Sequence, residues 1–301
     1  MPNDYNMNID KVTLVGGTHG NEYTGPYLLN LFAKRGSTAQ YSTFELNFLL
    51  ANPKAYEKNV RFIDVDLNRS FFSKDLSNYL LGHYEANRAK VIHQLLGPKE
   101  TTDLIIDVHT TTANMGVSII LVQKNSYNLQ LAAYIKSRIP DVFIYYIDPE
   151  AYNGTADHSF LNSLAKYGFS LELGPIANGV IRHDILMLAY ETTLACLDFI
   201  EQKNKGVERD IENEIDIYEH VSTVEFPLDS EGKIAAMIHA DIQDMDYNVL
   251  KLGTPIFEKF DGEIIFNSEY EGFFPVFINE AAYYYKNIAF SLTKKRKINI
   301  L

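Results

Sequence analysis

Short apolar runs alternate with longer helical patterns over the first two thirds of this chain, and this alternation constrains the fold most strongly. It predicts an α/β fold, with a mixed, largely parallel sheet flanked by helices. The expected strands are Val12–Val15, Leu46–Ala51, Leu104–Val108, Val117–Val122, Val142–Ile147 and Phe169–Leu173. The expected helices are Glu22–Lys34, Tyr79–Leu96, Asn128–Arg138, Ser159–Tyr167 and Ile185–Glu201.

A polar, charged stretch at residues 203–214 separates the alternating strand and helix patterns from a C-terminal part that has only short β-type runs. We therefore expect a first domain at residues 1–208 and a smaller β-rich domain at residues 209–301. Asp261-Gly262 separates two apolar runs of this second part and is a strong hairpin signal. The expected strands are Tyr218–Phe226, Ile234–Ile238, Pro255–Phe260, Glu263–Phe266 and Phe274–Ile278.

Charge and composition exclude some classes of function. The formal net charge of −12 argues against a nucleic acid or an anionic membrane as the main partner. The single cysteine, Cys196, permits no internal disulfide and is expected in the core. No apolar run is long enough to span a bilayer, so a cytoplasmic protein is expected.

Glycines surround a histidine and a glutamate that directly follow the first apolar run. His19 and Glu22 stand three residues apart, where the chain should turn from a strand into a helix. An imidazole and a carboxylate at this spacing can converge on one metal ion, and zinc takes such nitrogen and oxygen ligands. The glycines allow a tight turn, although Gly16-Gly17 could equally begin a turn that cradles phosphate.

A second histidine, His109, closes another strand-like run. It stands at the carboxyl end of that strand, where open α/β sheets bind ligands, and it would complete the three protein ligands of a catalytic zinc site. Asp107 faces the same side of the strand and could orient the imidazole. The other six histidines are expected to be surface or packed side chains: His83, His93, His158, His183, His220 and His239.

Other segments carry polar side chains suited to catalysis. Arg61 and Arg69 could hold a carboxylate, or could belong to a solvated surface cluster. Glu172 lies inside an apolar strand, where desolvation would raise its pKa and suit it to general-base work. A structural hydrogen bond is the alternative for Glu172. The three tyrosines and the lysine at residues 283–286 either form a surface of the β domain or place one phenol over the groove.

Together these segments resemble the aspartoacylase family, which are zinc amidohydrolases of the carboxypeptidase-like fold. The resemblance covers nearly the whole chain and rests on Gly16–Glu22, Asp66–Arg69, Asp107–His109, Asn114–Gly116, Glu172–Pro175 and Val276–Tyr284. It implies that one Zn²⁺ per chain is held by His19, Glu22 and His109. It also implies that Glu172 activates water and that Arg61 stabilises the oxyanion.

The resemblance further implies how substrate would bind. Asn68 and Arg69 would hold a carboxylate, and Tyr284 would close over the substrate. The β-rich domain would narrow the entrance and favour small substrates.

The chain departs from the family pattern near the substrate. Asn162 stands where the family has an arginine for the aspartyl carboxylate, and His158 stands where it has a tyrosine. A neutral amide cannot replace a guanidinium fork, and His158 could contribute only if charged. Thr110 replaces a usual asparagine, and Lys286 is the nearest match for a lysine that follows the tyrosine pair.

We therefore expect a zinc-dependent amidohydrolase that cleaves N-acyl amino acids. N-acetyl-L-aspartate is the leading substrate, and other neutral or aromatic N-acyl amino acids are the alternative. A zinc carboxypeptidase acting on short peptides and a metal-binding or ligand-sensing protein without turnover are the rivals. The expected partner is the small-molecule substrate, and the resemblance suggests a homodimer.

Overall fold

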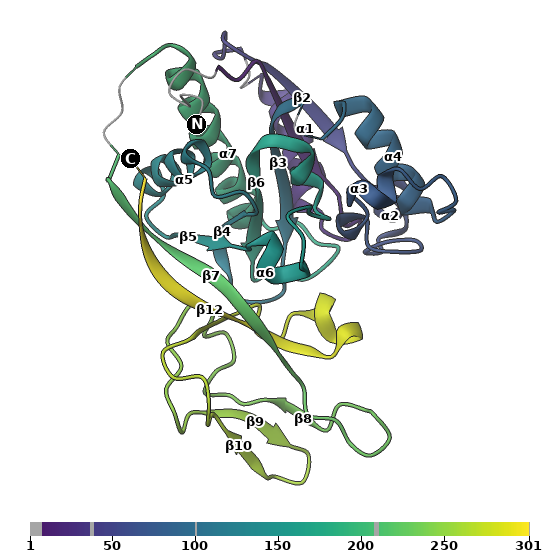
Figure 1. The fold of residues 1–301 in the computed structure, drawn as a ribbon, viewed down its shortest axis with the longest axis vertical. Helices are drawn as coiled ribbons and strands as arrows, with labels where there is room; N and C mark the ends of the chain where they lie inside the picture. The colour runs from purple at the N-terminus through teal and green to yellow at the C-terminus, as the bar shows by residue number, and fades with distance from the viewer. Residues whose placement is uncertain (1–7, 37–38, 100, 208–210, 301) are drawn as a thin grey trace.

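A large mixed sheet organises the computed structural model, which describes residues 8–36, 39–99, 101–207 and 211–300. Its nine strands lie in the order β11-β12-β7-β5-β4-β6-β3-β1-β2 (Figure 1). The first six strands in the sequence are β1 Lys11–Gly16, β2 Glu45–Leu50, β3 Thr102–Thr110, β4 Gly116–Leu121, β5 Val142–Tyr146 and β6 Ala165–Gly174. The last three strands of this sheet are β7 Glu214–Glu225, β11 Phe274–Val276 and β12 Ile288–Asn299.

Parallel pairing brings the carboxyl ends of β1, β2, β3 and β6 to one edge of the sheet. These four strands pair in parallel, β4 runs antiparallel to β6, and β5 pairs in parallel with both β4 and β7. His109 at the end of β3 is thereby the register partner of Glu172 on β6. The predicted α/β class is confirmed, and the pairing places two of the predicted site residues side by side.

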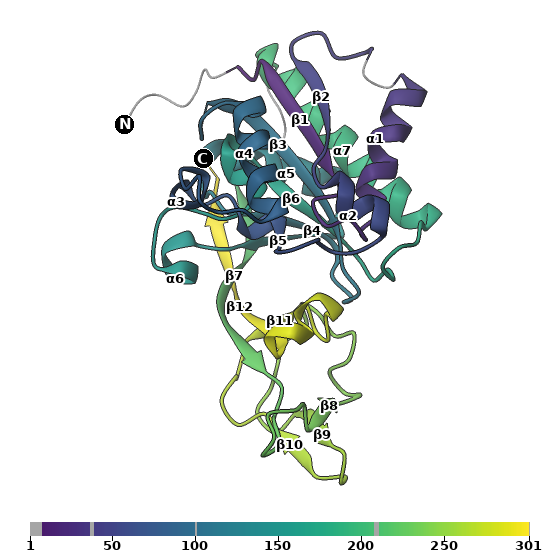
Figure 2. The same ribbon diagram turned by 90° about the vertical axis from the view of Figure 1, so that its right-hand side faces the viewer.

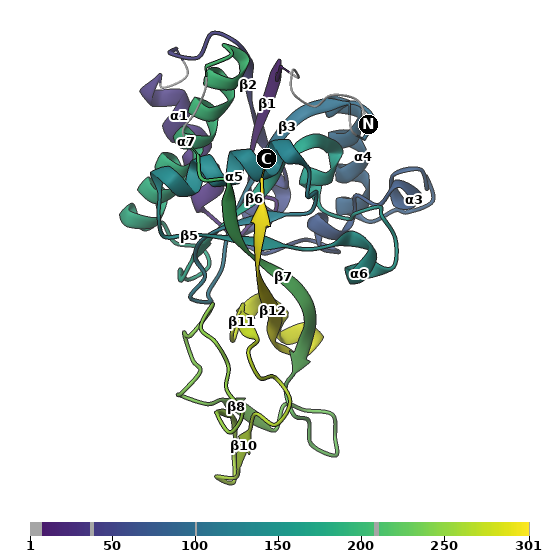
Figure 3. The ribbon, with the colours of Figure 1, turned by 60° about the vertical axis from the view of Figure 1, so that its left-hand side comes forward.

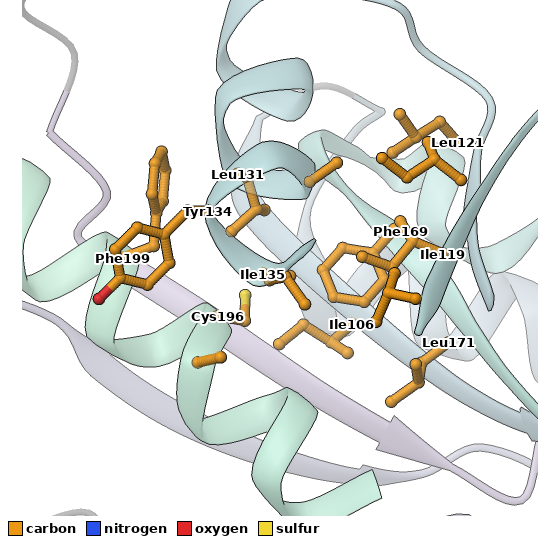
Figure 4. Packing of buried hydrophobic residues seen from close by; sticks show 14 of the residues in the cluster. Ile106, Ile119, Leu121, Leu131, Tyr134, Ile135, Phe169, Leu171, Cys196 and Phe199 are labelled. Atoms are coloured by element: carbon orange, nitrogen blue, oxygen red, sulfur yellow. The ribbon is translucent and has the colours of Figure 1, made fainter. Parts of the chain in front are cut away.

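Helices cover both faces of the sheet. The helices α1 Thr24–Arg35, α5 Ser126–Arg138 and α7 His183–Asn204 pack on one face, and α4 Tyr84–Leu96 packs on the other (Figure 1). Cys196 is fully buried where α5 and α7 meet the sheet, as expected (Figure 4). Short helical turns complete the N-terminal part: α2 Pro53–Lys58, η2 Leu67–Arg69, α3 Ser73–Leu76, α6 Pro149–Asn153 and η3 Leu161–Leu164.

The C-terminal part extends from the sheet on two long antiparallel strands, β7 and β12 (Figures 2 and 3). At its far end lies a three-stranded sheet of order β10-β9-β8, formed by β8 Ala236–Ile238, β9 Pro255–Lys259 and β10 Ile264–Phe266. The hairpin predicted at Asp261-Gly262 joins β9 to β10. A separate apolar core fills this part, and the 3₁₀ helix η4 Ala281–Lys286 returns the chain toward the N-terminal part. The predicted boundary at residues 208 and 209 lies outside the described residues.

One prediction of secondary structure was wrong, and one strand was missed. The expected helix Ser159–Tyr167 is only the 3₁₀ turn η3, after which β6 begins at Ala165. Pairing with β3 decides this, because Gly168 has a φ of 128° and lies against the Ile105 backbone, where a Cβ would meet the carbonyl oxygen. The strand β12 was not expected, since its basic end masks the apolar pattern. Among the described residues, no helix is long and apolar enough to cross a membrane.

Candidate metal centre and active site

The turn after β1 carries the first two candidate metal ligands. Glycine is required there because the backbone passes very close to neighbouring segments: a Cβ on Gly20 would lie 2.0 Å from the Ala55 carbonyl carbon. The Glu22 amide donates to the His19 carbonyl oxygen at 3.2 Å, which closes the turn. Both side chains are buried, and α1 begins just after them at Thr24.

His19, Glu22 and His109 converge on one point. Each offers a ligating atom, and these atoms lie within 4.8 Å of one another. The Glu22 carboxylate lies 2.6 Å from His19 Nδ1 and 3.0 Å from His109 Nδ1, and the two Nδ1 atoms are 3.2 Å apart. The structure thus brings together the three residues predicted as metal ligands.

Carboxylates hold the outer nitrogen of each imidazole. His19 Nε2 lies 3.1 Å from Asp66 Oδ1, and His109 Nε2 lies 2.9 Å from Asp107 Oδ2. A proton on each Nε2 satisfies these carboxylates and leaves the Nδ1 lone pairs facing each other and Glu22. Such a buried group of acceptors needs a cation at its centre, so the donor set fits a divalent metal ion of the zinc type.

Charge interactions around the cluster favour a positive charge at its centre. Burial by itself would raise the pKa of Glu22, but the neighbouring His19 and His109 hold that pKa well below its usual value. Burial would lower the pKa of His109, yet the carboxylates of Asp107 and Glu22 raise it. Asp66 also has a lowered pKa, because His19, Arg69 and Arg61 outweigh its burial. The carboxylates therefore stay ionised, and the imidazole of His109 is a strong base.

Glu172 lies beside this cluster, on β6, and is buried. Among the described residues none donates a hydrogen bond to its carboxylate. Burial raises the pKa of Glu172 well above its usual value, and the nearby carboxylates of Glu22 and Glu280 raise it further against the opposing effect of His109. A carboxylate with free lone pairs and a raised pKa next to a metal site can accept a proton from water.

Arg61 bridges the cluster and its outer carboxylates. Its Nη1 donates to Glu22 Oε1 at 3.1 Å and its Nη2 to Asp66 Oδ2 at 3.3 Å. Burial opposes the charge, but the carboxylates of Asp66 and Glu22 raise the pKa of Arg61, so it remains a cation. A guanidinium has five N–H donors, and those not used here remain for a substrate oxygen. The alternative of a solvated surface cluster is therefore wrong for Arg61.

A buried glutamate holds the loop that carries Arg61 to Arg69. The Glu85 carboxylate is fully buried and accepts hydrogen bonds from the amides of Ile63 at 2.6 Å, Asp64 at 3.0 Å and Val65 at 3.2 Å. These hydrogen bonds satisfy the amides of residues 63–65, which belong to no helix or strand. No sequence pattern pointed to Glu85, which stands on α4 among ordinary helix residues.

Asn68 and Arg69 follow on η2 and face the same cavity. The Asn68 side-chain oxygen accepts from the Leu161 amide at 2.9 Å, which leaves its nitrogen directed toward the cluster, 3.5 Å from His109 Nε2. The Arg69 guanidinium stacks over the Phe160 ring at 4.5 Å and donates to its neighbour's carbonyl. Both predicted substrate-binding residues thus line the cavity.

Tyr284 is not placed as expected. It is 45% exposed, its hydroxyl bonds Asn279, and its ring packs on Phe226. Tyr283 lines the cavity instead. Successive residues of the 3₁₀ helix η4 point about 120° apart, so only one of two adjacent tyrosines can face inward.

His158 and Asn162 lie behind the cavity wall. His158 is buried, its ring contacts Phe160 at 4.1 Å, and burial together with Arg69 and Lys99 lowers its pKa to about 3. It is therefore uncharged at neutral pH and cannot act as a cation. Asn162 is also buried, and neither polar atom of its amide has a hydrogen-bond partner among the described residues. Neither side chain lines the cavity that holds the cluster.

The cavity includes residues that the sequence did not reveal. His220, expected only as a surface or packed side chain, lines it together with Tyr145 and Tyr152. Lys286 also lines the cavity, at an exposed position, and partial desolvation lowers its pKa. The full lining is His19, Arg61, Asn68, Arg69, His109, Ile120, Tyr145, Ile147, Tyr152, Phe160, Ser170, Glu172, His220, Thr223, Phe277, Tyr283, Lys286, Ile288 and Ser291.

The chain therefore combines a mixed α/β sheet with a buried His-Glu-His cluster that can hold a metal ion, and a β-rich part that completes its cavity. The family model described as the succinylglutamate desuccinylase/aspartoacylase catalytic domain matches residues 8–200. The model described as the AstE/AspA barrel-sandwich hybrid domain matches residues 213–295. The chain belongs to the succinylglutamate desuccinylase/aspartoacylase family.

Individual relatives match over nearly their whole length. A probable aspartoacylase of Trichodesmium erythraeum is 44% identical, with 97% of this chain and 99% of the relative covered. An N-acyl-aromatic-L-amino acid amidohydrolase (carboxylate-forming) of Xenopus laevis is 40% identical, with 96% and 95% covered. The crystal structure of murine aminoacylase 3 superposes with a TM-score of 0.91 at 36% identity, covering 98% of both chains.

Proposed function

We propose that the protein hydrolyses the amide bond of N-acyl amino acids, with one Zn²⁺ held by His19, Glu22 and His109. The observation that carries this proposal is the buried ligand cluster beside Glu172, whose carboxylate has no hydrogen-bond donor among the described residues. Metal binding alone would not require such a carboxylate, whereas hydrolysis needs a base that takes a proton from water. The names of the relatives, which include aspartoacylases and an N-acyl-aromatic-L-amino acid amidohydrolase, support the same reaction.

The side chains divide the chemistry between them. When bound, zinc would supply the Lewis acidity that polarises the scissile carbonyl and makes water more acidic. Glu172 takes a proton from the attacking water as the water oxygen bonds to the carbonyl carbon. Arg61 donates hydrogen bonds to the oxyanion that develops there. Glu172 then passes its proton to the amide nitrogen as the C–N bond breaks, which releases a carboxylate and a free amino acid.

The α-carboxylate of the substrate has a natural place beside the cluster. Arg69 and Asn68 both line the cavity, and the Asn68 amide nitrogen lies 3.5 Å from His109 Nε2. A guanidinium and an amide can bind the two carboxylate oxygens together. This assignment leaves the Lys286 ammonium at the cavity as a further cation.

The remaining lining favours an uncharged substrate side chain. It is formed largely by Tyr145, Tyr152 and Phe277, and burial lowers the pKa of His220 to about 4, so this imidazole is neutral at pH 7. Neutral or aromatic N-acyl amino acids are therefore our leading substrates. N-acetyl-L-aspartate is the second candidate, favoured by Lys286.

The test is acetate release by the zinc-loaded protein from N-acetyl-L-tyrosine, N-acetyl-L-methionine and N-acetyl-L-aspartate, with and without a chelator. We expect release that the chelator stops and added zinc restores. Preference for the aspartate compound would reverse our order of substrates and leave the reaction in place. No release from any of the three would refute the proposed function.

A further inference from the structure

Two loops of the β-rich part carry residues other than glycine in a left-handed backbone conformation. In the loop at residues 243–248, Asp244 and Tyr247 have φ angles of 63° and 61°. In the turn after β11, Phe277 and Asn279 have φ angles of 55° and 59°. The two other such residues in the described part of the chain are asparagines that end helices. A bulky aromatic residue in this conformation is strained, and strain of this kind is typical of functional sites.

The strained residue Phe277 forms part of the wall of the cavity that holds the ligand cluster. Its ring centroid lies 5.4 Å from that of Tyr283 and 6.2 Å from that of Tyr145, and all three residues line the cavity. The backbone angles of a residue set the direction of its Cβ relative to the flanking peptides, so the left-handed conformation directs this ring into the wall. Whatever fixes the backbone at Phe277 therefore fixes one side of the space that a substrate would occupy.

A buried carboxylate holds the backbone at this turn. The Ile278 amide donates to Asp246 Oδ1 at 3.1 Å, and Asp246 is only 6% exposed. The Ile278 amide belongs to the planar peptide group that follows Phe277, so its direction fixes the ψ angle of Phe277. The Phe277 amide donates to the Met115 sulfur at 3.2 Å, and a thioether sulfur is a weak acceptor. The carboxylate of Asp246 is thus the stronger of these two holds on the turn.

Further hydrogen bonds join the two segments and anchor them on the large sheet. Asn279 Nδ2 donates to Gln243 Oε1 at 2.9 Å, which adds a second side-chain bond between the loop and the turn. The Tyr247 hydroxyl lies 2.8 Å from Ser118 Oγ on β4, and Ser118 is the register partner of Glu172. The loop is therefore fixed to the sheet beside the proposed base, and a displacement of either segment would change the shape of the cavity.

We propose that Asp246 is a positioning residue for substrate binding: its carboxylate holds the turn at Phe277 and thereby keeps the Phe277 ring in the cavity wall. Asp246 itself is not among the described residues that line the cavity. This inference rests on the proposed function. Without the carboxylate, the turn relaxes toward an unstrained conformation and the ring leaves the wall. The ligand cluster and Glu172 stay in place, so substrate binding weakens while the chemical step persists.

The test measures kcat and KM separately for the zinc-loaded protein. The substrate is whichever of N-acetyl-L-tyrosine, N-acetyl-L-methionine and N-acetyl-L-aspartate the native protein hydrolyses fastest. Asp246→Leu removes the acceptor, and we expect KM to rise roughly three- to tenfold, the value of one aromatic contact, with kcat within about twofold of native. Asp246→Asn keeps one oxygen for the Ile278 amide and should keep the native KM. Asp241→Leu, at an exposed position of the same part, is the matched control and should also keep it.

A double-mutant cycle separates a positioning role from a general loss of stability. If Asp246 acts through the ring of Phe277, it has nothing left to position once that ring is removed. We therefore expect Asp246→Leu to leave KM unchanged when it is added to Phe277→Leu. Two effects on KM that multiply would show that Asp246 does not act through Phe277, which overturns the inference.

The possible failures can be told apart. If the native protein hydrolyses none of the three compounds, the proposed function falls and this inference falls with it. Hydrolysis with an unchanged KM in Asp246→Leu, or with a KM that Asp246→Asn raises as much, overturns the role of Asp246 and leaves the proposed function standing. Should Asp246→Leu not fold, Gln243→Ala takes its place, because it removes the bond to Asn279. A raised KM in that variant supports the inference, and an unchanged KM overturns it.

Discussion

At the scale of single residues, the tautomer of each imidazole decides what the cluster can do. His19 and His109 are both held at Nε2 by a carboxylate, so both present Nδ1 to the centre. The sequence indicated Asp107, because residues two apart face the same side of a strand. It could not indicate Asp66, which comes from a separate loop and meets His19 only in the folded chain. The ligands and Asp107 were thus predictable from the sequence, whereas Asp66, which orients His19, was not.

Glu172→Gln tests the proposed base. We expect turnover to fall by roughly 10²- to 10⁴-fold, because glutamine cannot take a proton from water. The zinc content, measured by atomic absorption, should stay at one per chain. Glu191→Gln on α7 is the control and should keep full activity. Substantial turnover by the Glu172 variant would show that another group is the base.

Asp107→Asn tests the orientation of His109. The Asp107 carboxylate accepts from the Thr18 hydroxyl at 2.7 Å and from His109 Nε2, whereas an asparagine has only one side-chain oxygen. We expect zinc to bind roughly 10- to 100-fold more weakly in a chelator-competition titration. Asp103→Asn at the start of β3 is the control. Equal zinc affinity in the two variants would mean that Asp107 does not orient the ligand.

At the scale of elements, long periodic segments were predictable and short irregular ones were not. The strands of the catalytic part and the helix α7 follow from apolar periodicity, which the packing of the core requires. The turn η3 does not, because pairing of the following residues with β3 overrides a helical pattern. Which tyrosine of η4 lines the cavity depends on how the 3₁₀ helix is rotated about its axis. The sequence does not reveal that rotation, so it could not show that Tyr283 and not Tyr284 faces the cavity.

Glu85→Gln tests how the arginine loop is held. Glutamine has one oxygen where the carboxylate has two, so at least one of the three loop amides loses its acceptor. We expect the free energy of unfolding to fall by about 1–3 kcal/mol in urea denaturation, with faster hydrogen exchange at Ile63, Asp64 and Val65. Glu57→Gln, at an exposed position on α2, should change neither quantity. Unchanged exchange in the Glu85 variant would show that other contacts fix the loop.

At the scale of the whole molecule, a buried acid makes stability depend on pH. Burial raises the pKa of Asp246 to about 7, and its Oδ2 has no hydrogen-bond partner in the described part of the chain. The folded state therefore keeps a proton that the unfolded state releases at lower pH. This contribution to stability is complete below about pH 4 and is lost as the pH rises toward 7.

Asp246→Asn should remove this pH dependence. Asparagine keeps an acceptor for the Ile278 amide, which now bonds Asp246 Oδ1 at 3.1 Å. We expect the variant to be more stable than the native protein at pH 8, by up to roughly 4 kcal/mol, and close to it at pH 4. Chemical denaturation at the two pH values measures both differences, with Asp261→Asn in the exposed hairpin as control. Equal differences at both pH values would contradict a raised pKa.

The whole cavity was the least predictable feature, because distant parts of the chain build it. His220 comes from β7, Tyr145 from β5 and Ser291 from β12, and each looks ordinary in its own segment. Only the order of strands in the sheet brings them together. The sequence motifs and the resemblance to a family predicted the cluster and the base, whereas these three lining residues came from the fold.

The strands β7 and β12 belong at once to the large sheet and to the β-rich part, and eleven paired positions tie them to each other. The β-rich part therefore cannot rotate about a hinge relative to the rest of the large sheet, since any rotation would break backbone hydrogen bonds along the shared strands. The width of the cavity entrance is therefore set by the backbone of the shared strands. A rigid compound that fits this opening would lose little binding energy to loop ordering, and drift in substrate preference would come from exchanging side chains on an unchanged frame.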